Sequence, residues 1–181
     1  MTAEHNRGQQ EIEGTEALRH PGAGPVPTRA WRWLMLAVAI IILDQLTKMA
    51  VRETLSLHEI VPIAPFLNLT LVHNTGAAFS FLNDAGGWQR WLFIGLAFAV
   101  SAGIVVWLLR HGDERSWYTL ALTLVLGGAV GNLCDRLTLG YVIDFIDVYY
   151  QGWHWPAFNV ADSAISIGAA LLLVDALKPS R

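Results

Sequence analysis

Four runs of apolar residues, each close to the length that crosses a lipid bilayer, dominate the pattern along this chain. They cover about 31–51, 91–109, 117–134 and 160–177. About 20 mainly apolar residues are needed to span the hydrocarbon core as a helix, and the second run contains no charged residue. The pattern predicts an all-α membrane protein with four transmembrane helices at these positions.

A polar stretch precedes the first run. Residues 1–30 contain Gly and Pro, show no hydrophobic period and have no apolar core of the kind found in signal peptides. A composition of this kind favours disorder. We therefore expect a disordered cytoplasmic tail over 1–30 and one integral membrane domain over 31–178.

Basic residues predict how the helices are oriented. They flank the start of the first run, the short link between the second and third runs, and the end of the fourth: Arg29, Arg32, Arg110, Arg115, Lys178 and Arg181. Links and ends rich in Lys and Arg stay in the cytoplasm, so both termini are predicted there. The segments at about 52–90 and 135–159 then lie outside, although they contain some basic residues as well.

The first outer segment contains a predicted strand. At 67–72, Leu alternates with Asn, Thr and Val, which is close to the period-two pattern of a half-exposed strand. Pro62 and Pro65 break any helix before it, and Gly76 permits a tight turn after it. We expect a small β-sheet on the outer face of the membrane.

Polar residues gather at the outer ends of the runs. Asp44 lies thirteen residues into the first run, or about 20 Å along a helix. The others are Gln45, Thr47, Lys48, Asn74, Asn132, Asp135, Arg136, Asp144, Asn159 and Asp162. A carboxylate at the centre of a membrane helix costs about 2.5–3.5 kcal/mol, so a group of them at one depth indicates a functional site.

Each polar motif also has a purely structural interpretation when taken alone. Asp44 and Lys48 have the spacing of a helical ion pair, and Asn159 or Asp162 is suited to cap a helix start. Glycines at 127, 128 and 131 suit close helix packing. Only their convergence on one side of the membrane favours function.

Composition excludes several chemistries. Charged residues make up 15% of the 181 residues and the net charge is −3, against about 25% charge in soluble domains; the mean hydropathy is +0.41. The chain contains no block of basic residues that would indicate binding to nucleic acid. The single cysteine, Cys134, excludes an intramolecular disulfide. No HExxH motif occurs, and the histidines at 58, 73, 111 and 154 lack metal-ligand spacing.

Paired carboxylates remain. Asp144 and Asp162 flank one outer segment, so a reversal of the chain would bring them together. Two close carboxyl groups cannot both ionise readily and therefore share a proton. One then activates water while the other donates to a substrate carbonyl.

Two other functions fit some of these residues. A small transporter or proton channel also uses intramembrane Asp and Asn, but it needs them through the full depth of the membrane. A non-catalytic membrane scaffold would use the glycines for packing and the aspartates as helix caps.

Five blocks of sequence then carry a resemblance. They are "DQLTK" (44–48), "NTGAAF" (74–79), "GGAVGNLCDR" (127–136), "VIDF" (142–145) and "FNVADSAI" (158–165). In order and spacing they resemble the signature blocks of lipoprotein signal peptidase, or signal peptidase II, over about 31–177. The resemblance implies a bacterial inner-membrane aspartic endopeptidase with four helices, an outer cradle of strands and a short amphipathic segment.

The resemblance also implies substrates and partners. Members of this family remove the signal peptide of a prolipoprotein just before its diacylglyceryl-modified cysteine, with no metal or organic cofactor. Membrane lipid and globomycin-type inhibitors are further implied partners; nucleic acid is not one, and a monomer would suffice.

The matching blocks also imply roles for individual residues of this sequence. The resemblance implies that Asp144 and Asp162 are catalytic and that polar positions bind substrate or inhibitor, namely Asn74, Asn132, Arg136 and Asn159. It implies supporting roles for Asp44, Lys48, Gly76 and Asp135. Asp147, close to Asp144 in sequence, is expected not to be catalytic.

Overall fold

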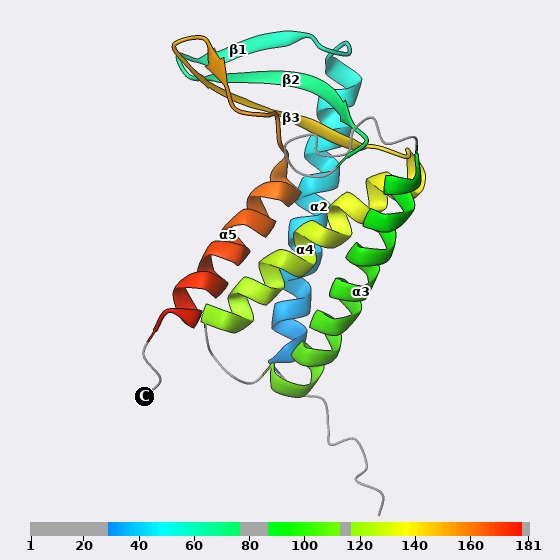
Figure 1. Cartoon of the computed structure of the whole chain (residues 1–181), viewed down its shortest axis with the longest axis vertical. Helices are drawn as coiled ribbons and strands as arrows, with labels where there is room; N and C mark the ends of the chain where they lie inside the picture. Colours follow the sequence, from blue (N-terminus) through cyan, green and yellow to red (C-terminus); the bar gives the residue numbers. More distant parts are fainter. Residues whose placement is uncertain (1–28, 77–86, 113–116, 179–181) are drawn as a thin grey trace, which may run out of the picture.

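The computed structural model describes residues 29–76, 87–112 and 117–178. Helices lie beside one another and a small sheet covers one end of them (Figure 1). The elements in chain order are α2 (Ala30–Thr54), β1 (Ile60–Ala64), β2 (Leu67–Asn74), α3 (Trp88–His111), α4 (Trp117–Thr138), β3 (Val142–Tyr150), β4 (Trp153–His154) and α5 (Val160–Ala176). The mainly helical fold and the small sheet are both confirmed.

Three helices, α2, α3 and α4, are long and apolar enough to cross a membrane. Helix α5 has 17 residues, or about 26 Å at the usual rise, which is shorter than the roughly 30 Å of a hydrocarbon core. The fourth membrane span therefore stays a prediction. Helices α2 and α3 each extend three residues beyond the predicted runs at the sheet end, to Thr54 and from Trp88.

Two other predictions fall mostly outside the described residues. The tail predicted to be disordered lies there except for Arg29 and Ala30, and Ala30 already begins α2. The short amphipathic segment corresponds to none of the elements in the described parts of the chain.

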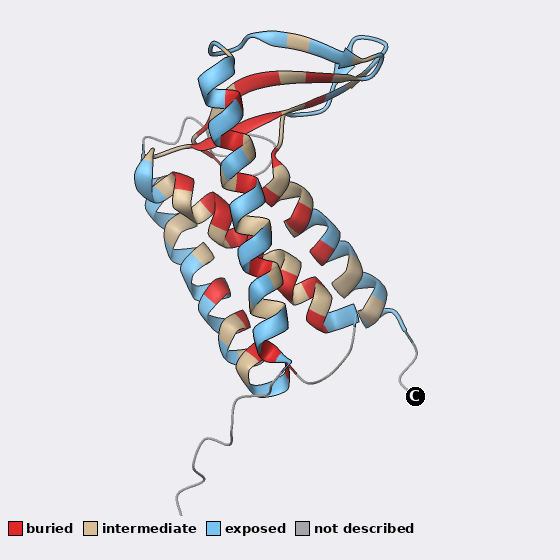
Figure 2. Ribbon diagram, turned by 180° about the vertical axis from the view of Figure 1, so that it is seen from behind, coloured by how far each residue is buried: buried red, intermediate tan, exposed pale blue. Residues whose placement is uncertain are grey.

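Helix α4 occupies the centre of the helical layer and packs against α2, α3 and α5 (Figure 1). Its buried residues face these neighbours, while the outer faces of α2 and α3 are exposed (Figure 2). Glycines make the close approaches possible: a Cβ on Gly127 would lie 2.8 Å from Cβ of Ile40, and one on Gly131 would lie 2.7 Å from Oδ2 of Asp44. The packing interpretation of these glycines is therefore correct.

We expect Gly131→Ala to lower the free energy of unfolding in detergent by about 1–3 kcal/mol, the usual cost of overpacking. The new methyl group would push against the buried Asp44 carboxylate. The matched control is Gly103→Ala in α3, where a Cβ would meet nothing within 4 Å. A Gly131→Ala protein as stable as the control variant would contradict this packing.

The sheet is antiparallel with the strand order β1-β2-β3-β4. Val51 at the end of α2 joins Leu71, Ile143 and Phe145 in one apolar cluster, which holds the sheet against the helices. The strand predicted at 67–72 is confirmed. Its polar Asn68, Thr70 and Asn74 are buried together with Leu71, whereas Leu67 and Leu69 are only half-buried. The buried side of β2 therefore carries polar groups.

Candidate active site

Asp144 lies on β3 between two buried apolar residues and is 2% exposed. Its Oδ2 accepts a hydrogen bond from Nδ2 of Asn74 at 2.9 Å, and its Oδ1 accepts one from Nδ2 of Asn159 at 2.8 Å. Asn74 reaches it from the last position of the neighbouring strand β2. Amide groups from two different elements thus fix both oxygens of this carboxyl group.

Asp162 lies in the first turn of α5. Asn159 is the N-cap, because its Oδ1 accepts a hydrogen bond from the backbone N–H of Asp162 at 2.8 Å. The side chain of Asp162 is therefore not used for capping, and its Oδ1 instead accepts from Nδ2 of Asn132 at 2.7 Å. A carboxylate at this place is stabilised by the helix dipole.

Asn132 and Asn159 connect the two aspartates. Asn159 Nδ2 donates to Asp144 and also to Oδ1 of Asn132 at 3.2 Å, while Asn132 Nδ2 donates to Asp162. An unbroken hydrogen-bonded chain therefore runs Asp144–Asn159–Asn132–Asp162. It joins α4, β3 and the start of α5, which follow one another closely along the chain.

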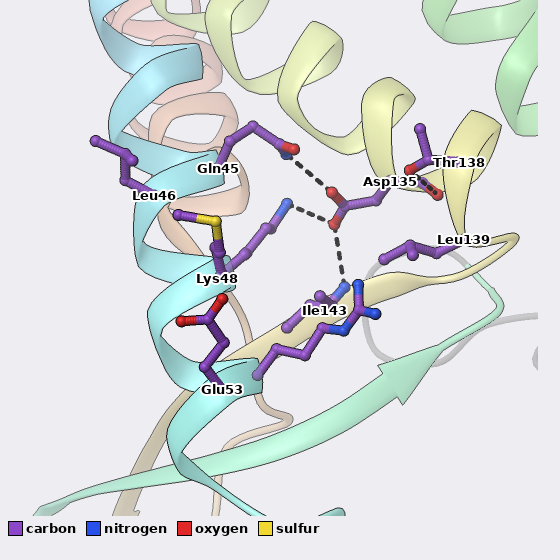
Figure 3. A pocket seen from close by; sticks show the side chains of 10 residues that line it. Gln45, Leu46, Lys48, Glu53, Asp135, Thr138, Leu139 and Ile143 are labelled. Carbon is purple, nitrogen blue, oxygen red and sulfur yellow. Dashed lines mark hydrogen bonds and ion pairs between the residues drawn. The ribbon is translucent and has the colours of Figure 1, made fainter.

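Lys48 holds this chain in place from α2. Its Nζ lies 2.7 Å from Asp44 Oδ2, 2.9 Å from Asp135 Oδ2 and 2.9 Å from Asn132 Oδ1. The two carboxylates extend the network. Asp135 accepts from the backbone N–H of Ile143 (Figure 3), and Asp44 accepts from that of Ala161. The ion pair suggested by the spacing of Asp44 and Lys48 is present, as part of a buried network.

Both aspartates line one cavity of about 460 Å³. It is open to the surface between the start of α5 and the segment 155–158, and Asn74, Ser163 and Ile167 also contribute to its walls. Of the other residues expected to bind substrate, Asn132 and Asn159 touch the aspartates but do not line the cavity.

Burial, as the larger cause, and the negative charge of Asp162 raise the pKa of Asp144 to about 7. The hydrogen bond from Asn74, the charge of Lys48 and the hydrogen bond from Asn159 act against this rise. Asp144 can therefore keep its proton near neutral pH and act as an acid, while the second carboxyl group is ionised and acts as a base. The arrangement is therefore suited to the attack of water on a carbonyl.

Arg136 and Gly76 meet at the edge of the site. One terminal nitrogen of Arg136 donates to the carbonyl oxygen of Gly76 at 2.8 Å, while its buried Nε has no hydrogen-bond partner among the described residues. Gly76 N–H donates to the side chain of Asn74 at 2.9 Å. Arg136 thus holds the turn that follows β2, the turn from which Asn74 reaches Asp144.

Two polar residues to which the sequence analysis assigned no role in the site make contacts that it did not predict. Gln45 donates to Asp135 at 2.8 Å and to the carbonyl oxygen of Gly131 at 3.2 Å. Asp147 is buried and accepts from Asn68 at 2.7 Å, and it also pairs with His154 Nδ1 at 2.8 Å. Asp147 does not line the cavity of the two aspartates. The burial of Asn68 and Asp147 follows from strand pairing, for which the local sequence carries no signal.

Comparison with known proteins identifies the family. A family model described as signal peptidase (SPase) II matches residues 36–178. The chain belongs to the signal peptidase II family. The match includes both aspartates, the asparagines between them and the Lys48 network.

Individual members of the signal peptidase II family are similar in sequence to this chain over most of its length. The lipoprotein signal peptidase of Ralstonia nicotianae is 49% identical and covers 99% of each chain. That of Acinetobacter baumannii strain ATCC 17978 is 58% identical over 79% of this chain and 81% of its own. A solved bacterial membrane enzyme, 30% identical, superimposes with a TM-score of 0.72 over 83% of this chain and 94% of that one. The protein is therefore a membrane protein of a peptidase family.

Proposed function

We propose that this protein is an aspartic endopeptidase of the bacterial inner membrane that removes signal peptides from prolipoproteins. The cut lies just before the diacylglyceryl-modified cysteine. One observation carries the proposal: Asp144 and Asp162 line the same cavity and are joined by amide hydrogen bonds. Family membership adds the substrate class, since the matched relatives are lipoprotein signal peptidases.

The proposed reaction needs only the two carboxyl groups and water. The ionised carboxylate takes a proton from water as its oxygen attacks the scissile carbonyl carbon, and the protonated partner donates to the carbonyl oxygen. When the tetrahedral intermediate collapses, the carbon–nitrogen bond breaks and the proton taken from water passes to the leaving nitrogen. The proton donated to the carbonyl oxygen returns to the carboxylate that supplied it, so both carboxyl groups regain their starting states. Asn132 and Asn159 orient the pair, while Asn74 reaches the cavity itself and is the best placed of the amides to meet substrate or a globomycin-type inhibitor.

The orientation of the protein completes the proposal. With its termini in the cytoplasm, as the basic residues favour, the sheet and the cavity lie on the periplasmic side. A lipid-modified cysteine is anchored at that surface, so the scissile bond reaches the cavity while the signal helix stays in the bilayer. The polar groups gather at the sheet end, which favours a site at one surface over the alternative of a pathway through the membrane.

The test uses purified protein in detergent and two precursors, one carrying diacylglyceryl on its cysteine and one unmodified. We expect cleavage of the lipidated precursor alone, with product masses that place the cut immediately before the modified cysteine. Equal cleavage of both precursors, or a cut at another bond, would refute the proposed specificity.

The pKa of Asp144 gives a prediction for pH dependence. A carboxyl group whose pKa is raised to about 7 is protonated below that pH and loses its proton above it. The shared proton is then lost, so we expect kcat/KM to fall as pH rises through about 7. The measurement is the pH profile of precursor cleavage.

Asn74→Ala tests whether this fall in kcat/KM reports the pKa of Asp144. The Asn74 hydrogen bond lowers the pKa of Asp144, so its removal raises that pKa and moves the alkaline fall in kcat/KM to higher pH. Asn68→Ala is the control, because Asn68 binds Asp147 instead. An alkaline limb that stays in place in Asn74→Ala, or moves to lower pH, would count against the assignment.

A further inference from the structure

A second cavity, of about 540 Å³, lies where the sheet-side ends of α2 and α4 meet β3 (Figure 3). It shares no lining residue with the cavity of the two aspartates. Its floor is polar and closed: Lys48 and Asp135 pair at 2.9 Å, and Gln45 donates to Asp135. These groups already satisfy one another.

The mouth of this cavity is different. Arg52 and Glu53, the adjacent charged residues near the end of α2, are both exposed and line it. Neither has a hydrogen-bond or ion-pair partner among the residues that the structure describes. Figure 3 shows Glu53 beyond Lys48 on α2, on the side toward the sheet. An unpaired cation and an unpaired anion thus stand side by side at the sheet end of a membrane helix.

An apolar stripe leads away from this charged pair toward the start of α2. Its members recur every three or four residues, each is between 44% and 66% exposed, and two of them, Leu46 and Met49, also line the cavity. They are Met49, Leu46, Ile42, Val38 and Met35. Residues at this spacing share one face of a helix. A charged pair at one end of an apolar stripe is complementary to an amphiphile that lies parallel to the helix, with its headgroup at the charged end.

We propose that this cavity binds a membrane phospholipid with a zwitterionic, primary-amine headgroup, of the phosphatidylethanolamine class. Arg52 takes the phosphate, for which the guanidinium fork is well matched. Glu53 accepts N–H groups of the ammonium, and an acyl chain follows the stripe on α2. This lipid is a bound partner of the fold, separate from the lipid on the substrate, because the cavity is separate from the aspartates.

Charge balance selects this lipid class over others. The cavity is lined by two cations, Lys48 and Arg52, and two anions, Glu53 and Asp135, so it offers no excess of positive charge to an anionic lipid. A quaternary choline headgroup has no N–H to donate to Glu53. A primary ammonium with a phosphate satisfies both free groups at once.

The test measures lipid retention and needs no substrate, so it is independent of the proposed cleavage. The purified full chain is mixed with equal amounts of dioleoyl phosphatidylethanolamine, phosphatidylcholine and phosphatidylglycerol in detergent, and bound lipid is read by native mass spectrometry. We expect phosphatidylethanolamine to be retained about tenfold over each of the others, the size of one charge-assisted hydrogen bond at an exposed site.

Two variants locate the site. Arg52→Gln with Glu53→Gln is expected to abolish the preference, and Met49→Trp to reduce total retention by filling the cavity. The control, Arg110→Gln with Asp175→Asn, removes the same two charges at the opposite helix ends and keeps the preference. Equal retention of all three lipids, a preference for phosphatidylglycerol, or an unchanged preference in the Arg52/Glu53 double variant would overturn the proposal.

Discussion

Asp162→Asn is expected to lower kcat/KM for the lipidated precursor by at least about 10²–10⁴-fold, the usual contribution of a general acid or base. The amide keeps an oxygen to accept the 2.7 Å hydrogen bond from Asn132, so the fold should be retained while proton transfer is lost. The measurement is the rate of precursor cleavage, with unfolding in detergent followed in parallel.

Asp144→Asn should reduce the rate by a similar factor, with a small additional loss of stability. Both oxygens of Asp144 accept N–H groups, and an amide nitrogen would face one of those donors. Asp147→Asn is the control. Asp147 lies on the same strand as Asp144 and is also buried, but it does not line the cavity of the two aspartates. Loss of activity in Asp147→Asn equal to that in Asp162→Asn, at unchanged stability, would argue that the wrong pair has been assigned.

Lys48→Met is expected to lower the free energy of unfolding by about 3–5 kcal/mol, the cost of leaving buried charges unpaired. Lys48 is 2% exposed and its Nζ contacts two carboxylates, those of Asp44 and Asp135. Without the ammonium, these two buried carboxylates repel each other with no cation between them. The measurement is denaturant unfolding of the purified protein in detergent.

Lys178→Met is the matched control for Lys48→Met. Lys178 also pairs with an aspartate, Asp175 at 3.0 Å, but the Lys178 side chain is exposed and that of Asp175 is only partly buried. Such exposed pairs contribute about 0–1 kcal/mol. Equal stability of the two variants would show that the Lys48 network does not hold the helices and the sheet together.

The helices and the gathering of the candidate site residues could be predicted from sequence because both leave strong local signals. An uninterrupted apolar run has few structural alternatives, and a polar residue such as Asp44 or Asp162 inside one is conspicuous. The five blocks then placed the chain in its family, which the comparisons confirmed. Even the open choice between capping and chemistry at 159–162 has a simple answer: Asn159 caps α5, which leaves the carboxyl group of Asp162 available.

What sequence could not provide is how the chain pairs across distance. The alternation at 67–72 predicts a strand, but the register that turns Asn68 inward toward Asp147 depends on β3, about eighty positions away. Similarly, Gln45 looks like an ordinary polar neighbour of Asp44 until α4 brings Asp135 against it. The fourth span also stays open, because α5 has 17 residues and about 20 are needed to span the hydrocarbon core.

The central claim is that Asp144 and Asp162 act as one catalytic unit, and a double-mutant comparison tests it most directly. Cleavage of the lipidated precursor is measured for Asp144→Asn, Asp162→Asn and the protein with both changes. Groups that act together give losses that do not multiply. We predict that all three proteins share nearly the same residual rate. Losses that multiply in the double variant, or a wild-type rate in either single variant, would contradict the account.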